Sequence, residues 1–171
     1  GLAATDADAK QHVRLAHFHA AVAHFALAND KCLQGLSGGA QESLRASLNH
    51  ARAALQYNAR FGAAHFQGAK AAAALGDGDA LLPLLQGAVE VDPRYAQRSL
   101  ADPDFQPFSA QIQATLARYH GELKASCRKL IVNLRPAARQ AKAWQHAVAD
   151  GLRRAIDEGE GALAGDDLDG T

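Results

Sequence analysis

Four histidines near the start of the chain, His12, His17, His19 and His24, form the densest group of side chains that could bind a metal ion or transfer protons. Imidazole is the commonest metal ligand in proteins. On a helix, however, two ligands converge on one ion only when they lie three or four residues apart. These histidines pair at a spacing of seven, which separates the members of a pair by about 10.5 Å along a helix axis. The spacing therefore predicts polar flanks between packed helices and no metal site.

The remaining acids and thiols do not assemble a catalytic pattern either. An enzyme needs a nucleophile beside a base, or two carboxylates in one pocket. The acids of the middle of the chain fall in predicted loops, where aspartate forms turns and caps helices: Asp77, Asp79, Asp102 and Asp104. The stretch 76–79 lacks the length and ligand pattern of a phosphate or calcium loop. We therefore predict no enzyme activity, no catalytic residue, no metal and no cofactor.

Composition favours helix throughout the chain. Of 171 residues, 48% are hydrophobic but only 6% are aromatic, and alanine supplies an unusual share. Alanine is the best helix former, and runs of β-branched residues, which favour strands, are scarce. We predict an all-α fold with helices at 9–33, 40–57, 62–75 and 80–91, separated by glycine-rich breaks at 34–40 and 76–79.

The first predicted helix carries two apolar stripes. One consists of bulky side chains, and the other consists mostly of alanines. A helix that is apolar on two sides is typical of the interior of a helical stack. We therefore expect neighbours on both sides of this helix. The two stripes are Leu15, Phe18, Val22 and Phe25, and then Val13, Ala16, Ala20, Ala23 and Leu27.

An internal repeat is the most informative signal. Residues 54–61 (ALQYNARF) and 88–95 (AVEVDPRY) match in residue type at nearly every position, with an offset of 34 residues. A fixed period in this range is typical of stacked helical hairpins. The unit 62–95 also places His65 and Phe66 at an early aromatic position, the small pair Gly68 and Ala69 at a helix contact, and Asp92-Pro93 at its end.

In these residues the chain resembles the tetratricopeptide-repeat (TPR) family, with one good unit at 62–95 and a partial preceding unit at 42–61. Two positions depart from the family pattern, since Leu81 replaces a small residue and Ala59 replaces the terminal proline of the earlier unit. The resemblance implies a protein–protein interaction scaffold or adaptor that binds a protein or peptide partner in the groove of its first helices. It implies partner-binding roles for Arg60, His65, Gln67 and Lys70.

Beyond residue 95 the pattern changes. Phe105 and Phe108, flanked by two prolines, are expected to cap the array. A coiled-coil-like seam follows, and Pro136 should interrupt its helix, giving either a bent helix or a helical hairpin. We thus predict an array at 1–108, a helical extension at 109–158 and a disordered acidic tail at 159–171, with homodimerisation through the seam as an alternative function. The seam is Ile112, Leu116, Tyr119, Leu123, Cys127, Leu130 and Leu134.

Charge is segregated although the net charge is zero. Residues 118–154 contain nine Lys or Arg and two acids, whereas residues 155–171 contain six acids and no base. This basic surface could be a solvated flank paired with the acidic tail, a contact for an acidic protein, or a site for nucleic acid or an anionic membrane. Zero net charge and the lack of aromatic base-stacking residues argue against nucleic acid. The surface comprises Lys124, Arg128, Lys129, Arg135 and Arg139.

The cellular setting is indicated only by composition. No apolar stretch approaches the roughly 20 residues that span a bilayer, so we predict a soluble protein without a transmembrane segment. Cys32 and Cys127 match no zinc or redox spacing, and we expect two buried free thiols in a reducing compartment such as the cytoplasm. The absence of methionine, even at position 1, and the polar end lead us to expect a segment of a larger protein. The Ala- and Arg-rich composition favours a bacterial source.

Overall fold

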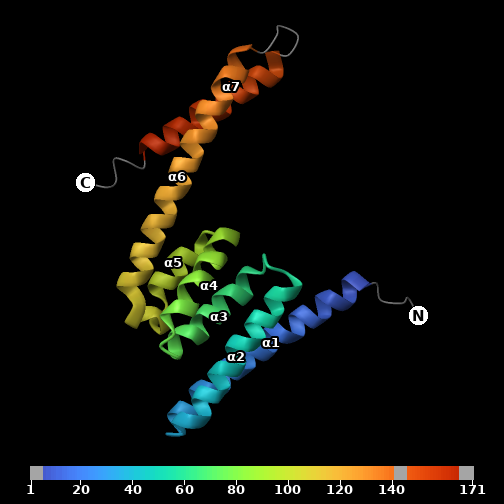
Figure 1. Ribbon diagram of the computed structural model, residues 1–171, viewed down its shortest axis with the longest axis vertical. Coiled ribbons are helices and arrows are strands. Elements are labelled where there is room, and N and C mark those ends of the chain that lie inside the picture. Colours follow the sequence, from blue (N-terminus) through green and yellow to red (C-terminus); the bar gives the residue numbers. More distant parts are fainter. Residues whose placement is uncertain (1–5, 141–145, 166–171) are drawn as a thin grey trace. The chain divides into compact units, whose positions relative to one another are not determined.

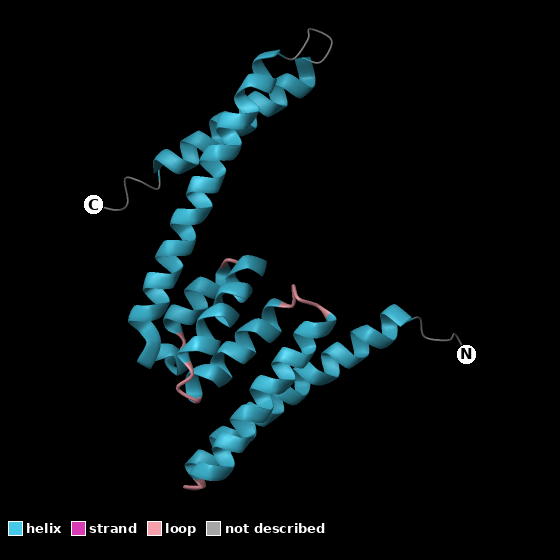
Figure 2. Ribbon diagram, in the orientation of Figure 1, coloured by secondary structure: helices cyan, strands magenta, loops and turns pink. Residues whose placement is uncertain are grey.

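A computed structural model describes residues 6–140 and 146–165 of the chain, and helices and short turns make up these residues, with no strand among them (Figures 1 and 2). The all-α prediction is therefore confirmed. The chain divides into two compact units, residues 1–116 and 117–171. The elements in order are α1 (Asp6–Leu33), α2 (Ser37–Tyr57), α3 (Gly62–Ala74), α4 (Gly78–Val91), α5 (Arg94–Ala101), the 3₁₀ helix η1 (Pro103–Phe108), α6 (Ser109–Gln140) and α7 (His146–Gly165).

The first unit contains two helical hairpins, α1–α2 and α3–α4, which close through the same kind of turn. Gly35 and Gly76 occupy the left-handed region, with φ of 76° and 74°. After each glycine, a backbone N–H reaches back over the turn, from Leu36 to the Lys31 carbonyl and from Asp77 to the Ala72 carbonyl, both at 2.9 Å. This is the glycine-dependent helix stop, because other residues rarely adopt positive φ.

The turns that leave the hairpins are also alike, and they coincide with the 34-residue repeat. Asn58 ends α2 and Asp92 ends α4, both in extended backbone. The Asn58 side-chain oxygen accepts from the Arg60 backbone N–H at 2.9 Å, and the Asp92 carboxylate accepts from that of Arg94 at 3.0 Å. Short acceptors at these positions stabilise the turn before the next helix. The sequence repeat thus corresponds to a repeated turn, and the helix packing is consistent with an array of helical hairpins.

Helix α3 lies at the centre of the first unit and is built almost wholly of small residues. Its alanines at 64, 69, 71 and 72 have no exposed surface. A Cβ added to Gly68 would lie 3.2 Å from both the Ala51 Cβ and a Leu84 methyl, so the missing side chain lets α2 and α4 approach α3 closely. Phe66 is the one bulky buried side chain of α3, and the neighbouring helices contribute Leu44, Leu48, Leu81 and Leu85 to the core.

Aromatic rings close the end of this core at η1. Phe105 is buried and packs edge-on against Phe66, with 5.4 Å between ring centroids, and Phe66 also contacts Tyr95 at 5.0 Å. Phe108 is half-buried, and a Cβ at Gly78 would lie 3.1 Å from its ring. Phe105 and Phe108 thus cover the end of the array as the sequence predicts.

In the second unit, α6 and α7 fold back on each other. Arg135 of α6 forms an ion pair with Glu160 of α7, and a Cβ at Gly159 would lie 3.2 Å from an Ile131 methyl. The expected helical hairpin is therefore present, but the prediction that Pro136 interrupts the helix is wrong, because α6 continues to Gln140. A proline removes one backbone donor, and four more residues of helix follow that loss. The helix α7 also runs to Gly165, through the first part of the segment expected to be disordered, while residues 166–171 lie outside the described part.

Three further expectations differ from the structure. Helix α2 begins at Ser37, so Gly38 and Gly39 lie in its first turn, where backbone N–H groups need no helical acceptor. The alanine-rich stripe of α1 is mostly exposed, with Val13 at 39% and Leu27 at 42%. Cys32 and Cys127 are free as expected but exposed rather than buried.

None of the described helices is both long and apolar enough to cross a membrane.

Candidate functional site

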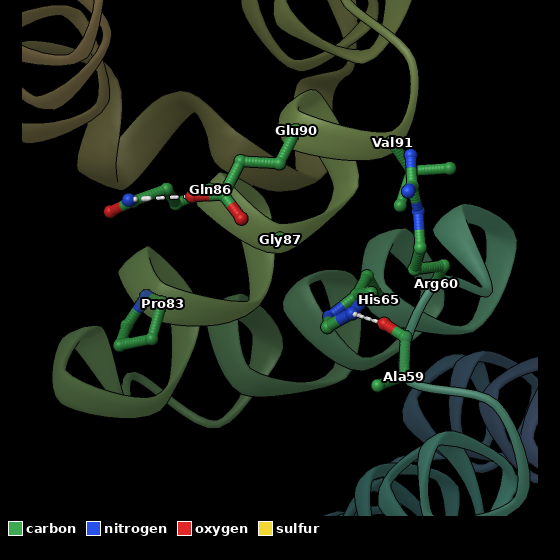
Figure 3. A pocket seen from close by; sticks show the side chains of 8 residues that line it. All are labelled: Ala59, Arg60, His65, Pro83, Gln86, Gly87, Glu90 and Val91. Carbon is green, nitrogen blue, oxygen red and sulfur yellow. Dashed lines mark hydrogen bonds between the residues drawn. The ribbon is translucent and has the colours of Figure 1, made fainter.

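An open pocket of about 630 Å³ lies between the α2–α3 turn and α4 (Figure 3). Its walls come from three places in the chain: the turn, the first part of α3, and one face of α4. Arg60 and His65, which the repeat resemblance assigns to partner binding, are both part of this lining. Residues three and four apart on α4 form the opposite wall because they share a helical face. The lining residues are Ala59, Arg60, His65, Pro83, Gln86, Gly87, Glu90 and Val91.

His65 connects the turn to the two helices. Its Nε2 lies 2.8 Å from the Ala59 carbonyl oxygen, which can only accept, so the neutral ring carries its proton on Nε2. Its Nδ1 is buried and has no hydrogen-bond partner. The ring packs against the backbone of Gly87, where an added Cβ would lie 2.6 Å from the ring carbon Cε1. The glycine therefore makes room for the imidazole and gives the pocket a fixed floor.

The lining of the pocket includes one cationic and one anionic side chain, and both are exposed. Arg60 is exposed and is the basic residue among those that line the pocket. Glu90 is the lining's carboxylate, and it already accepts a hydrogen bond of 2.9 Å from Gln86 Nε2 along α4 (Figure 3). A guanidinium can donate two parallel hydrogen bonds to a carboxylate. The pocket can therefore bind an acidic group at Arg60.

The other two residues expected to bind a partner lie elsewhere. Lys70 Nζ contacts the carboxylates of Asp102 and Asp104 at 2.9 Å and 2.8 Å and links α3 to η1. Burial alone lowers the pKa of Lys70, but hydrogen bonds and charge from Asp104 and Asp102 outweigh this effect and raise the pKa overall. Gln67 is half-buried, and its Nε2 is buried without a hydrogen-bond partner. The structure thus brings Arg60 and His65 together, and it places Lys70 in an internal ion pair.

Sequence reasoning missed the α4 wall of the pocket. Pro83, Gln86, Gly87 and Glu90 recur at spacings of three or four, which is the spacing of one helical face. That signal was present in the sequence. The sequence did not identify this face of α4 as part of a pocket. The α2–α3 turn lies opposite it, and the spacing of residues within α4 does not predict where that turn lies.

The predicted basic surface lies mainly on the exposed side of α6. Arg128 and Lys129 are exposed, and Lys124 is half-buried. Arg135 is engaged in the ion pair with Glu160, so one acid of the second unit does pair with this surface. The side chain of Arg139 lies outside the described part of the structure.

The predicted α6 seam is open along its middle. Leu123 is 49% exposed and Leu130 is 57% exposed, and Cys127 between them is also exposed. We call these three residues the α6 seam patch. Spacings of four and three place them on one face of the helix. Ile131, four residues after Cys127, contacts α7 at Gly159, while the three side chains of the seam patch stay exposed.

A second group of titratable side chains joins α1 to α2. His17 Nδ1 lies 3.0 Å from His50 Nδ1, and the His24 ring stacks on the His50 ring with 5.4 Å between centroids. Burial lowers the pKa of His50, and the nearby His17 and His24 lower it further. Within the described ranges, three or more His, Cys, Asp or Glu side chains nowhere gather in a way that could hold a metal ion. His50 was missed in the sequence, because it belongs to a different helix from the other histidines.

Compared with protein-family models, with curated proteins and with solved structures, the chain matches none. The functional argument therefore depends on the geometry of its own residues.

Proposed function

We propose that this chain is a protein–protein interaction module, a scaffold or adaptor, that binds an extended segment of a partner protein. The observation that supports the proposal is the open pocket lined by Arg60 and His65 between the α2–α3 turn and α4. A pocket of about 630 Å³ is of a size that accommodates a few side chains of a peptide. We further propose that the segment carries a carboxylate, because the exposed guanidinium of Arg60 can donate two parallel hydrogen bonds to such a group.

The resemblance to the TPR family supports the same function, since such modules bind partner segments. The two free, exposed cysteines are compatible with a reducing compartment, and we propose the cytoplasm. The helix-lined pocket offers no nucleophile beside a base, so the proposal assigns it binding and no chemistry.

The test is a peptide selection followed by a charge reversal. A displayed library of random peptides is selected on the folded chain, and the enriched peptides are synthesised and titrated against wild type, Arg60→Glu and Arg52→Glu. Arg52 is exposed on α2 and does not line this pocket, so Arg52→Glu controls for the change in net charge. We expect enriched peptides to contain Asp or Glu and to bind Arg60→Glu at least tenfold more weakly, about 1.4 kcal/mol.

Two results would contradict the proposal. The selection could enrich no sequence, or the enriched peptides could bind Arg60→Glu and Arg52→Glu equally well. Either result would mean that the pocket is not a partner site.

Self-association is a second candidate function, and the exposed α6 seam patch favours it. Two copies that pair through Leu123, Cys127 and Leu130 would cover apolar surface that each leaves open. Such apolar seams are the usual contact of paired helices. The measurement is sedimentation equilibrium of wild type, Leu130→Glu and Val132→Glu over a concentration series. Val132 is 66% exposed and lies two residues further along, on a different face of α6, so it is the matched control.

We expect wild type and Val132→Glu to dimerise and Leu130→Glu to remain monomeric. A wild type that is monomeric at high micromolar concentration would refute this second function.

A further inference from the structure

The junction between α1 and α2 contains four stacked or hydrogen-bonded rings. The His17 and His50 Nδ1 atoms face each other at 3.0 Å. On one side, the His24 ring lies nearly parallel to the His50 ring at an angle of 10°. On the other, the His17 ring stacks on Tyr57 at 6.1 Å, with an angle of 21°. We call His17, His24 and His50 the histidine cluster.

The contact between His17 Nδ1 and His50 Nδ1 depends on how many protons the two rings carry, so it is sensitive to acid. Two Nδ1 atoms at hydrogen-bond distance share one proton, so one ring donates and the other accepts. When both rings are protonated, each Nδ1 carries a hydrogen and two N–H groups point at each other. The hydrogen bond is then lost, and two like charges face each other at the same distance. Adding a charge to His24, stacked on His50, increases this repulsion.

On the described α1 and α2, no carboxylate lies one turn before or after a histidine of the cluster. The residues one turn before and after each histidine of the cluster on its own helix are apolar or Ser, apart from Arg14, which is itself a cation and packs over Phe61 at 4.9 Å. On α2 the charged residues Glu42, Arg45 and Arg52 are exposed, and Tyr57 is the ring stacked on His17. On α3, which packs on both helices, His65 is bonded to the Ala59 carbonyl and Lys70 to Asp102 and Asp104.

We propose that the histidine cluster is a pH-sensitive latch, which holds α1 on α2 while its rings are neutral and releases α1 when they gain protons in mildly acidic conditions. The release would break the buried hydrogen bond of 2.7 Å from the Ser47 hydroxyl to the Ala21 carbonyl. It would also uncover Ala21, Phe25 and Ala28, the buried side chains of α1. Mild acid would therefore expose apolar surface on the first hairpin.

The lowered pKa of His50 agrees with a loss of stability in mild acid. Burial and the neighbouring His17 and His24 lower the pKa of His50 in the folded state below the ordinary value of about 6.5. Below that value the unfolded chain binds more protons than the folded chain, so stability falls as the pH falls. The contribution of His50 is complete above about pH 6.5 and is lost as the pH falls through the lower pKa of the folded state.

The experiment measures hydrogen exchange of α1 amides by mass spectrometry from pH 7.5 to pH 5.0, with rates corrected for the intrinsic effect of pH. Wild type, His50→Gln and His12→Gln are compared at constant ionic strength, with EDTA present so that no bound metal contributes. Glutamine keeps a hydrogen-bonding side chain but cannot gain a proton. His12 is exposed on the same helix and is the matched control.

We expect the protection of α1 to fall on the order of tenfold between pH 7.5 and pH 5.0 in wild type and in His12→Gln. In His50→Gln it should stay nearly constant. An equal loss in His50→Gln, or no loss in wild type, would overturn the proposal.

A second measurement on the wild-type chain covers the case in which His50→Gln does not fold. Histidine ring signals are followed by NMR through the same pH range. The latch predicts that His50 titrates below its ordinary range. Titration of His50 at its ordinary value would overturn it.

Discussion

At the scale of single residues, His65 and Gly87 act as one unit. The imidazole is fixed by the Ala59 carbonyl on one side and by the bare backbone of Gly87 on the other. This arrangement explains why a glycine is tolerated in the middle of α4, where it disfavours helix by about 1 kcal/mol relative to alanine. Gly87 weakens α4, but the absence of a side chain there leaves the space that the His65 ring occupies.

Gly87→Ala should therefore destabilise the protein although alanine favours helix. The new methyl would lie 2.6 Å from the His65 ring, so the ring or α4 must move. We expect a loss of about 1–3 kcal/mol in the free energy of unfolding, measured by urea denaturation. Adding His65→Ala to this variant should recover part of the loss, because the clash disappears.

Gly38→Ala is the control for helix propensity, because an added Cβ there meets no atom within 4 Å. It should leave stability unchanged or slightly raised. Equal effects of Gly87→Ala and Gly38→Ala would show that His65 does not require the glycine.

Lys70 was expected to meet a partner, and its geometry instead predicts a structural role. Its ammonium group links α3 to η1 through Asp102 and Asp104, and its side chain is only 22% exposed. Lys70→Gln should lower the free energy of unfolding by about 1–2 kcal/mol, because two partly buried carboxylates lose their cation. Lys10→Gln, which breaks only an exposed pair with Asp6, should change it by less than about 0.5 kcal/mol.

The pH dependence of the Lys70 contribution has a definite sign. Since folding raises the pKa of Lys70, the stabilisation is complete below the unfolded value of about 10.4 and is lost as the pH rises through the higher folded value. The difference in unfolding free energy between wild type and Lys70→Gln should therefore shrink in strongly alkaline buffer. A difference that stays constant there, or no difference at neutral pH, would contradict this role.

At the scale of elements, local sequence chemistry predicted the helices and turns of the first unit well. Glycines at 35 and 76 stop α1 and α3, and the acceptors Asn58 and Asp92 open the turns after α2 and α4. These signals work because each acts within a few residues. Pro136 led to a wrong prediction of a helix end. Its missing N–H weakens α6 locally but does not end the helix.

Pairing between elements was less predictable than their bounds. The alanine-rich stripe of α1 and the seam of α6 both predict a covering neighbour, yet Leu27 and Leu130 are exposed. A periodic apolar face indicates that a helix can pack, and does not identify what packs on it. The same reason explains why Cys127, expected to be buried on the seam, is exposed.

At the scale of the whole molecule, the 34-residue repeat is the long-range feature of the sequence that corresponds to a repeated turn in the fold. It correctly places two equivalent turns, and Arg60 and Arg94 follow these turns at equivalent positions. The pocket required more, since it depends on how the α2–α3 turn faces α4, and no spacing within one helix contains that information. The resemblance predicts partner binding by Arg60 and His65, which both line the pocket, whereas the position of Glu90 and Gln86 opposite them is visible only in three dimensions.

The most direct test of partner binding is a chemical-shift map of the chain during titration with a selected acidic peptide. We predict that the backbone signals of Arg60, His65, Gly87 and Glu90 shift together and saturate at one affinity, and that Arg60→Glu abolishes these shifts. Signals that move only on α6, or that leave the pocket residues unchanged at saturation, would contradict the account.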